Sequence, residues 1–148
     1  MITLQEITPD NHAIARKMAV HPEQERLVAS IDKTLADAFV WKEAIFRVAT
    51  DGQTPIGYVF VFPFDDDGKH IVNIVRMMID AERQGKGWGR QLLDETIKWV
   101  STFTPKPDLL RISTLPDNEV ALALYKSSEF IEQGIEEGEI ALFRELNS

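Results

Sequence analysis

Short runs of apolar residues, several of them alternating with polar ones, recur along the chain and are typical of β-strands. They predict strands over residues 2–7, 44–50, 56–64, 70–79, 109–114 and 139–146. The second and third runs are joined by the turn DGQTP, so we expect them to form a hairpin. The run HIVNIVRMMI at 70–79 is apolar on both faces, which indicates a central strand.

Apolar residues at helical spacing predict helices between these strands. The first helix begins at residues 9–10 and ends at His21-Pro22, and the second runs from a cap at Ser30 or Asp32 to about Phe39. The third follows a glycine-rich turn and ends at about Thr102, and a short fourth helix lies within residues 118–130. Strands mixed with helices in this way predict an α/β fold whose sheet is covered on both faces. No linker marks a boundary, so we expect one domain over residues 1–148.

Composition and charge narrow the classes of function. No apolar run could cross a bilayer, and MITLQEITPD lacks the features of a signal peptide, so we expect a cytoplasmic protein without a membrane partner. With no cysteine in the chain, disulfides and thiolate catalysis are excluded. The net charge of −8 disfavours nucleic acid and would draw cationic small molecules to an acidic cleft, although acidity can equally serve solubility.

The segment RQGKGWGRQLLDETIKWV, residues 83–100, places a glycine-rich turn between a strand that ends at Ile79 and the start of a helix. The first amides of a helix lack internal partners, and glycine removes the Cβ that would keep an anion away. Lys86 and Arg90 add positive charge. The spacing fits neither a P-loop nor the dinucleotide fingerprint. A phosphate site is therefore predicted, with a turn that binds no ligand as the alternative.

The run from Gln84 to Gly89 resembles the Q/R-x-x-G-x-G/A motif of the GCN5-related N-acetyltransferase (GNAT) family. This resemblance implies acetyl-CoA as co-substrate and a mixed, mostly antiparallel sheet flanked by helices and splayed between its fourth and fifth strands. The cofactor-binding residues that it implies are Met77, Met78, Ile79, Gln84, Gly85, Lys86, Gly87, Trp88, Gly89, Arg90 and Asn118.

Residues 118–130 resemble a second segment of the family, N-x-x-A-x-x-x-Y-x-x-x-G-F. By this resemblance Asn118 contacts the cofactor and Tyr125 lies beside its sulfur, where a hydroxyl could protonate the departing thiolate. A tyrosine packed on a helix face is the alternative. Glu129 stands where the family has glycine, so we expect the end of this helix to manage without a glycine cap.

The acceptor side resembles bacterial spermine/spermidine acetyltransferases. Residues 23–38 carry a Q-x-x-x-V/I-A/E-S/N pattern of those enzymes, and residues 62–68 and 76–93 are also similar to theirs. A polyamine is a polycation that carboxylates and aromatic faces could bind. The candidates are Glu23, Glu25 and Asp66, together with Asp32, Asp65 and Asp67, and Trp41 and Phe64 as aromatic faces. For each acid, a solvated surface charge is the alternative.

The predicted activity is therefore transfer of an acetyl group from acetyl-CoA to a primary amine, by direct attack in a ternary complex. The favoured acceptor is a polyamine. Two alternatives stay open. One is the same chemistry on a protein N-terminus, a lysine or an amino sugar, and the other is a non-catalytic sensor of acyl-CoA. The sequence indicates no metal site and no general base, and it leaves a homodimer open.

Overall fold

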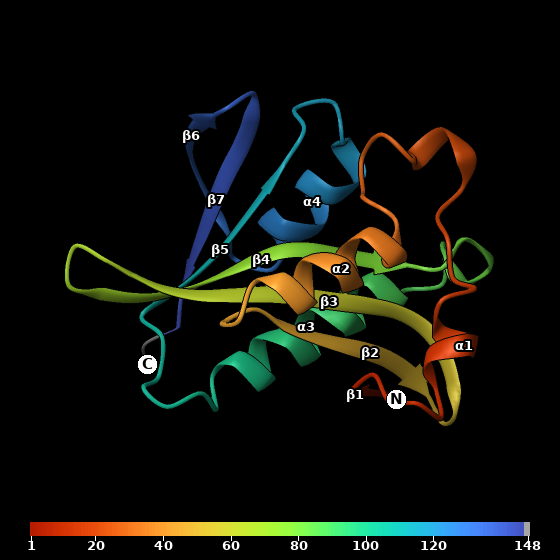
Figure 1. Ribbon diagram of the computed structural model, residues 1–148. Helices are drawn as coiled ribbons and strands as arrows, with labels where there is room; N and C mark the ends of the chain where they lie inside the picture. The colour runs from red at the N-terminus through yellow and green to blue at the C-terminus, as the bar shows by residue number, and fades with distance from the viewer. Residues whose placement is uncertain (147–148) are drawn as a thin grey trace.

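The computed structural model describes residues 1–146, in which seven strands form one sheet in the order β1-β2-β3-β4-β5-β7-β6 (Figure 1). All neighbouring strands are antiparallel except β4 and β5, which run parallel. The strands are β1 (Ile2–Gln5), β2 (Ile45–Asp51), β3 (Thr54–Asp66), β4 (Lys69–Ile79), β5 (Leu109–Thr114), β6 (Ile131–Glu136) and β7 (Glu139–Glu145). This mixed, mostly antiparallel sheet confirms the predicted fold class.

Helices cover the two faces of the sheet. They are α1 (His12–Ala15), α2 (Ile31–Val40), α3 (Trp88–Val100) and α4 (Glu119–Ser127), with short 3-10 turns η1 (Pro22–Gln24) and η2 (Ala81–Arg83). One apolar cluster packs under α3 and α4 and includes Leu92 and Tyr125, while a second lies under α1 and α2 and includes Phe60 and Met78. Within the part of the chain described, no helix combines the length and the apolar character that crossing a bilayer demands.

The first predicted helix is wrong in length, since α1 spans only four residues. The chain leaves the helix because residues further along bind a distant segment instead. The amide of Ala19 donates to Asp80 Oδ1 at 3.0 Å, and the carbonyl of Ala19 accepts from the amide of Ala81 at 2.8 Å. A long-range pairing has replaced the helical hydrogen bonds that the local pattern predicts.

Strand β6 was not predicted at all. Every residue of IEQGIE is exposed, so the segment carries no buried alternation that could signal a strand. It forms because a turn with positive φ at Glu137 (51°) and Gly138 (81°) folds it back onto β7. The remaining strands and α2 to α4 lie close to their predicted places, and β4 is central as expected.

The parallel pairing of β4 with β5 is short. It joins residues 71–74 of β4 to residues 109–112 of β5. Beyond these residues β4 continues to Ile79 and β5 to Thr114, but the two strands no longer pair with each other. The other edge of β4 stays bonded to β3, with Met77 opposite Val59 and Ile79 opposite Gly57. The sheet therefore splays at the predicted position, and one edge of β4 from residue 75 to 79 faces a gap.

Gly57 is required where β3 supports this free segment of β4. A Cβ added at Gly57 would lie 2.1 Å from the carbonyl oxygen of Met78. We expect Gly57→Ala to lower the free energy of unfolding by about 1–3 kcal/mol, because the backbone of β4 must move away. Denaturant titration measures this loss. Gly89→Ala is the control, since its nearest neighbour, Leu124 Cδ2, lies 3.7 Å away; equal stabilities would contradict the close approach.

Candidate active site

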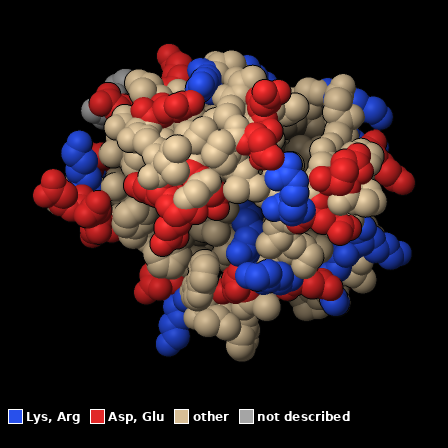
Figure 2. All heavy atoms as spheres, turned by 90° about the horizontal axis from the view of Figure 1, so that it is seen from above, with Lys and Arg blue, Asp and Glu red and all other residues tan. Residues whose placement is uncertain are grey.

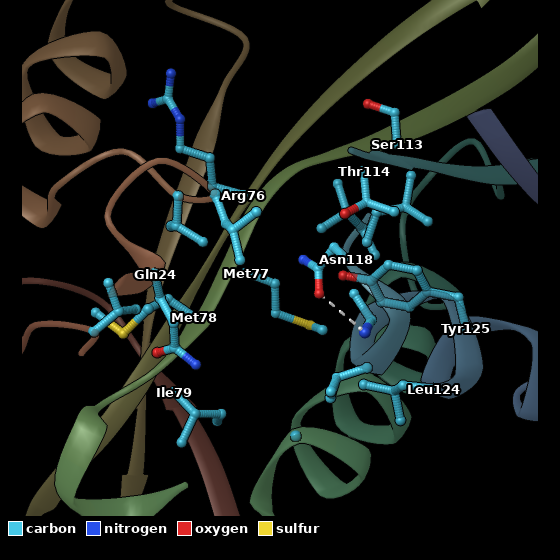
Figure 3. Close-up of a pocket in the computed structure, with 18 of the residues that line it drawn as sticks. Gln24, Arg76, Met77, Met78, Ile79, Ser113, Thr114, Asn118, Leu124 and Tyr125 are labelled. Atoms are coloured by element: carbon cyan, nitrogen blue, oxygen red, sulfur yellow. Dashed lines mark hydrogen bonds between the residues drawn. The ribbon is translucent and has the colours of Figure 1, made fainter. Parts of the chain in front are cut away.

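The gap between β4 and β5 opens into a cleft of about 990 Å³. Its walls come from β4, β5, the start of α3, α4 and the segment between α1 and α2, and Figure 3 shows side chains from several of these elements converging on it. This volume lies near the upper end of the range for small-molecule sites and suits a long, narrow ligand. The cleft contains most of the residues that the glycine motif implied.

Helix α3 begins in the cleft without a side-chain cap. Its N-cap is Gly87 and its first turn holds no acidic residue, whereas Ser30 caps α2 and Asn118 caps α4. Gly85 and Gly87 have φ values of 77° and 81°, which favour glycine, and a Cβ at either would meet nothing within 4 Å. Open space therefore lies in front of unbonded helix amides, as binding of a phosphate group requires.

Nine of the eleven predicted cofactor residues line this cleft, namely Met77, Met78, Ile79, Gln84, Gly85, Gly87, Gly89, Arg90 and Asn118. Lys86 is exposed on the turn and Trp88 packs against the apolar cluster, so neither forms the wall. Arg90 donates to the hydroxyls of Ser127 and Ser128 and pairs with no carboxylate in the described chain. Its charge is thus available to an anion at the start of α3.

Tyr125 lies at the inner wall of the cleft. The residue is 7% exposed, packs against Phe130, and burial raises its pKa to about 12. Within residues 1–146 its hydroxyl forms no hydrogen bond, and Figure 3 shows it pointing toward Asn118 and the gap. Asn118 accepts from the amide of Ala121 at 3.3 Å, which leaves its amide NH₂ for the cleft. A protonated, unpaired donor therefore faces the gap throughout the neutral pH range.

The end of α4 resolves the question raised by Glu129. This residue adopts the left-handed conformation, with a φ of 71°, that the glycine of the motif would adopt. Arg144 donates to the Glu129 carboxylate at 2.8 Å and also to the carbonyl of Ser128. The end of α4 has no glycine, as expected, yet Glu129 takes the left-handed conformation that a glycine would take there. This φ is unfavourable for a residue with a side chain.

The segment from residue 19 to 30 closes one side of the cleft. Gln24 and Gln84 exchange two amide hydrogen bonds of 2.9 and 3.0 Å. Further along, Arg26 reaches Asp117 before α4, with its Nη2 2.9 Å from Oδ2. The segment is thus tied to the glycine loop on one side and to the start of α4 on the other.

In and after η1, the cleft is lined by residues other than the predicted acids. Gln24 lines the cleft, together with Val28 and Ala29, whereas Glu23 and Glu25 on either side are exposed and do not. The Q-x-x-x-V-A-S pattern already contained this signal, because its first letter is Gln24 itself. Asp66 lies outside the cleft, in the β3–β4 hairpin, directly opposite Lys69.

The aromatic candidates do come together. Trp41, Phe62 and Phe64 form a second hollow of about 400 Å³ with Asn73 and Val75, and these last two residues also line the main cleft. Trp41 meets Phe62 edge to face, with ring centroids 6.2 Å apart. An aromatic groove therefore continues from the cleft along the face of the sheet that α2 covers.

Charges at the acceptor end are mixed but include unpaired carboxylates. Arg76 lines the cleft and lies 2.7 Å from Asp37, and the guanidinium, followed by Lys33, holds the pKa of Asp37 below its usual value. Three acids also line the cleft, namely Asp117, Glu119 and Glu139. On the face shown in Figure 2 acidic and basic residues are interspersed, without a continuous basic stripe. Within residues 1–146 no group of three His, Asp or Glu side chains could hold a metal.

Comparison with known proteins identifies the family. Residues 10–130 match the acetyltransferase (GNAT) family. A mycothiol acetyltransferase of Geodermatophilus obscurus is 33% identical over 126 residues, which are 82% of this chain and 40% of that protein, so the chain spans well under half of its relative. An acetyltransferase from Thermus thermophilus has the same fold, with a TM-score of 0.79, 17% identity and coverage of 98% and 97% of the two chains.

A spermidine N-acetyltransferase from Vibrio cholerae, solved with CoA and spermine, superposes with a TM-score of 0.78 at 16% identity, over 98% of this chain and 95% of that one. At such identities the structures establish the fold, while the family match establishes membership. The chain belongs to the acetyltransferase (GNAT) family. This confirms the resemblance and the fold, and it supports acetyl-CoA as the co-substrate.

The glycine loop yields a direct test of cofactor binding. Gly87→Glu would place a carboxylate in front of the α3 amides, so we expect the affinity for CoA, measured by calorimetry, to fall at least tenfold, about 1.4 kcal/mol. Gly87→Ala is the matched control, because it introduces the same strain at positive φ without a charge and should lose less. A folded Gly87→Glu variant that binds CoA as the unchanged protein does would show that the phosphates lie elsewhere.

Proposed function

We propose that this chain transfers the acetyl group of acetyl-CoA to a primary amine by direct attack in a ternary complex. The observation that carries the proposal is the splay between β4 and β5, which has unbonded helix amides at one end and the hydroxyl of Tyr125 facing it. Acetyl-CoA would supply a thioester that an amine can attack. The residues of the cleft would bind it, orient it and donate a hydrogen bond to its sulfur.

The chain's own groups divide this work by position. The amides of the glycine loop and Arg90 would hold the pyrophosphate, while the free edge of β4 at residues 75–79 would pair with the pantetheine arm as an added strand does. An amide of that edge would also stabilise the negative charge that develops on the thioester oxygen. Tyr125 would donate a hydrogen bond to the departing sulfur.

The high pKa of Tyr125 limits how it can act. Proton transfer is most effective when the pKa of the acid lies near the working pH, and a simple thiol has a pKa of about 8.5. A phenol with a pKa of about 12 therefore stabilises the leaving thiolate mainly through its hydrogen bond, and full transfer is uphill. The same value means that Tyr125 keeps its proton throughout the neutral range.

Tyr125→Phe removes only this hydroxyl. We expect turnover in a thiol-release assay to fall about 100-fold, the lower end of the range for general acids, with little change in CoA affinity. Because the folded pKa is raised from 10 to about 12, the acid form is lost only as the pH rises through that value, so Tyr125 should produce no alkaline decline below about pH 10. Unaltered turnover, with chemistry shown to limit the rate, would exclude the acid role.

For the acceptor we propose a polyamine, on three supports. The cleft is lined by Glu119 and Glu139, which have no basic partner within residues 1–146, and by Asp117, which pairs with Arg26. Arg76, which also lines it, is paired with Asp37. The aromatic groove around Trp41 continues from the cleft and suits a chain of methylenes and ammonium groups. The Vibrio cholerae neighbour, which shares the fold, was solved with spermine.

Neutralising an acid of the cleft tests this substrate class. Glu119→Gln should raise the KM for spermine more than the KM for a monoamine, with kcat preserved, because a longer cation meets more carboxylates. Glu23→Gln, Glu25→Gln and Asp66→Asn, whose acids lie outside the cleft, should have weaker effects of the same kind. We expect the smallest effect from Asp66, which faces Lys69 across the strand pair. Added salt should also raise the KM for spermine more than the KM for a monoamine, since screening weakens contacts between charges.

Equal effects on monoamines and polyamines would argue against the polyamine and leave the amine class open. A thiol-release panel of spermidine, spermine, lysine, an N-terminal peptide and an amino sugar distinguishes the remaining acceptors. Activity with none of them, together with tight CoA binding, would favour the non-catalytic sensor.

A further inference from the structure

Glu139 is a carboxylate of the cleft that has no part in the chemical step described so far. It opens β7, is half-buried and lines the cleft. The hydroxyl of Ser113 donates to its Oε1 at 3.1 Å. Two other acids nearby are paired with arginines, Glu136 with Arg111 and Asp117 with Arg26, whereas Glu139 has no basic partner within residues 1–146. The uncharged hydroxyl of Ser113 holds the carboxylate in place without neutralising its charge.

Strand geometry places this carboxylate at the opening of the splay. The last residues of β4 and β5 that pair are Ile74 and Ile112, so Ser113 is the first residue of β5 beside the gap. Ile112 packs in the same cluster as Tyr125, and successive residues of a strand point to opposite faces. Ser113 and the Glu139 that it holds therefore lie on the face opposite Tyr125, and Figure 3 shows the side chain of Ser113 directed away from the tyrosine.

We propose that Glu139 is the carboxylate that binds the acceptor amine and accepts its proton, and that Ser113 is the residue that positions it. This rests on the proposed acetyl transfer. The bound ammonium first gives one proton to Glu139, which passes it to solvent, and this leaves the neutral amine that attacks. As the nitrogen–carbon bond forms and the carbon–sulfur bond breaks, the nitrogen loses a second proton by the same route, and the coenzyme departs as its thiolate. The departing sulfur receives the hydrogen bond of Tyr125 from the other face. The two groups thus act on opposite sides of one acetyl group, and neither obstructs the other.

A nearly isosteric change that removes the charge separates this role from a structural one. Glu139→Gln should raise the KM for spermidine at least tenfold and also lower kcat, because both binding and proton removal are affected. Ser113→Ala should raise the KM less and leave kcat closer to the original value. Glu137→Gln is the matched control, since Glu137 is exposed in the turn of the same hairpin and lies outside the cleft. CoA affinity should stay constant in all three variants.

Equilibrium binding keeps this inference distinct from the proposed activity. Spermidine is titrated by calorimetry into the protein saturated with CoA, where no transfer can occur. Loss of spermidine binding in Glu139→Gln, but not in Glu137→Gln, supports the role of Glu139 even if no amine is acetylated. Unchanged binding, KM and kcat in Glu139→Gln would overturn it while acetyl transfer stands. Absence of both amine binding and transfer in the unaltered protein would overturn both.

Discussion

The early end of the pairing between β4 and β5 is the constraint on which the rest of the structure depends. Only four residues of each strand are bonded, so the amides and carbonyls along one edge of β4 have no strand beside them. An open edge of this kind invites another extended chain. The other edge of this segment is held by β3, where the absence of a side chain at Gly57 lets the carbonyl of Met78 approach closely.

A β-bulge at Val75 complements this arrangement. Phe60 pairs with Arg76 and Val61 with Ile74, so Val75 is an extra residue on β4. The bulge changes which side chains face which cluster, as Ile74 and Met77 belong to the same cluster although they are three positions apart, an odd spacing that would place them on opposite faces of a regular strand. Bulges bend a strand and increase its twist. The bulge lies directly after Ile74, the last residue of β4 that pairs with β5, so the change of direction coincides with the start of the gap.

The parts that the sequence predicts are those encoded by neighbouring residues. The glycines before α3, the cap at Asn118 and the spacing to Tyr125 each act within a few residues, and the structure brings them together as the motifs imply. The parts that it does not predict depend on distant partners. The end of α1 is decided by Asp80, and β6 is decided by its pairing with β7. The acceptor side combines segments near residues 24, 117 and 139, which no local pattern could bring together.

The reciprocal amide pair between Gln24 and Gln84 has a thermodynamic consequence. Gln84 belongs to the loop that would hold the coenzyme, and Gln24 to the segment that closes the acceptor side, so these two hydrogen bonds directly connect the two sites. If the coenzyme changes the affinity for the amine by some factor, the amine must change the affinity for the coenzyme by the same factor. Any cooperativity that depends on this contact would thus be equal in both directions, and exchanging either glutamine would remove it without touching a reacting atom.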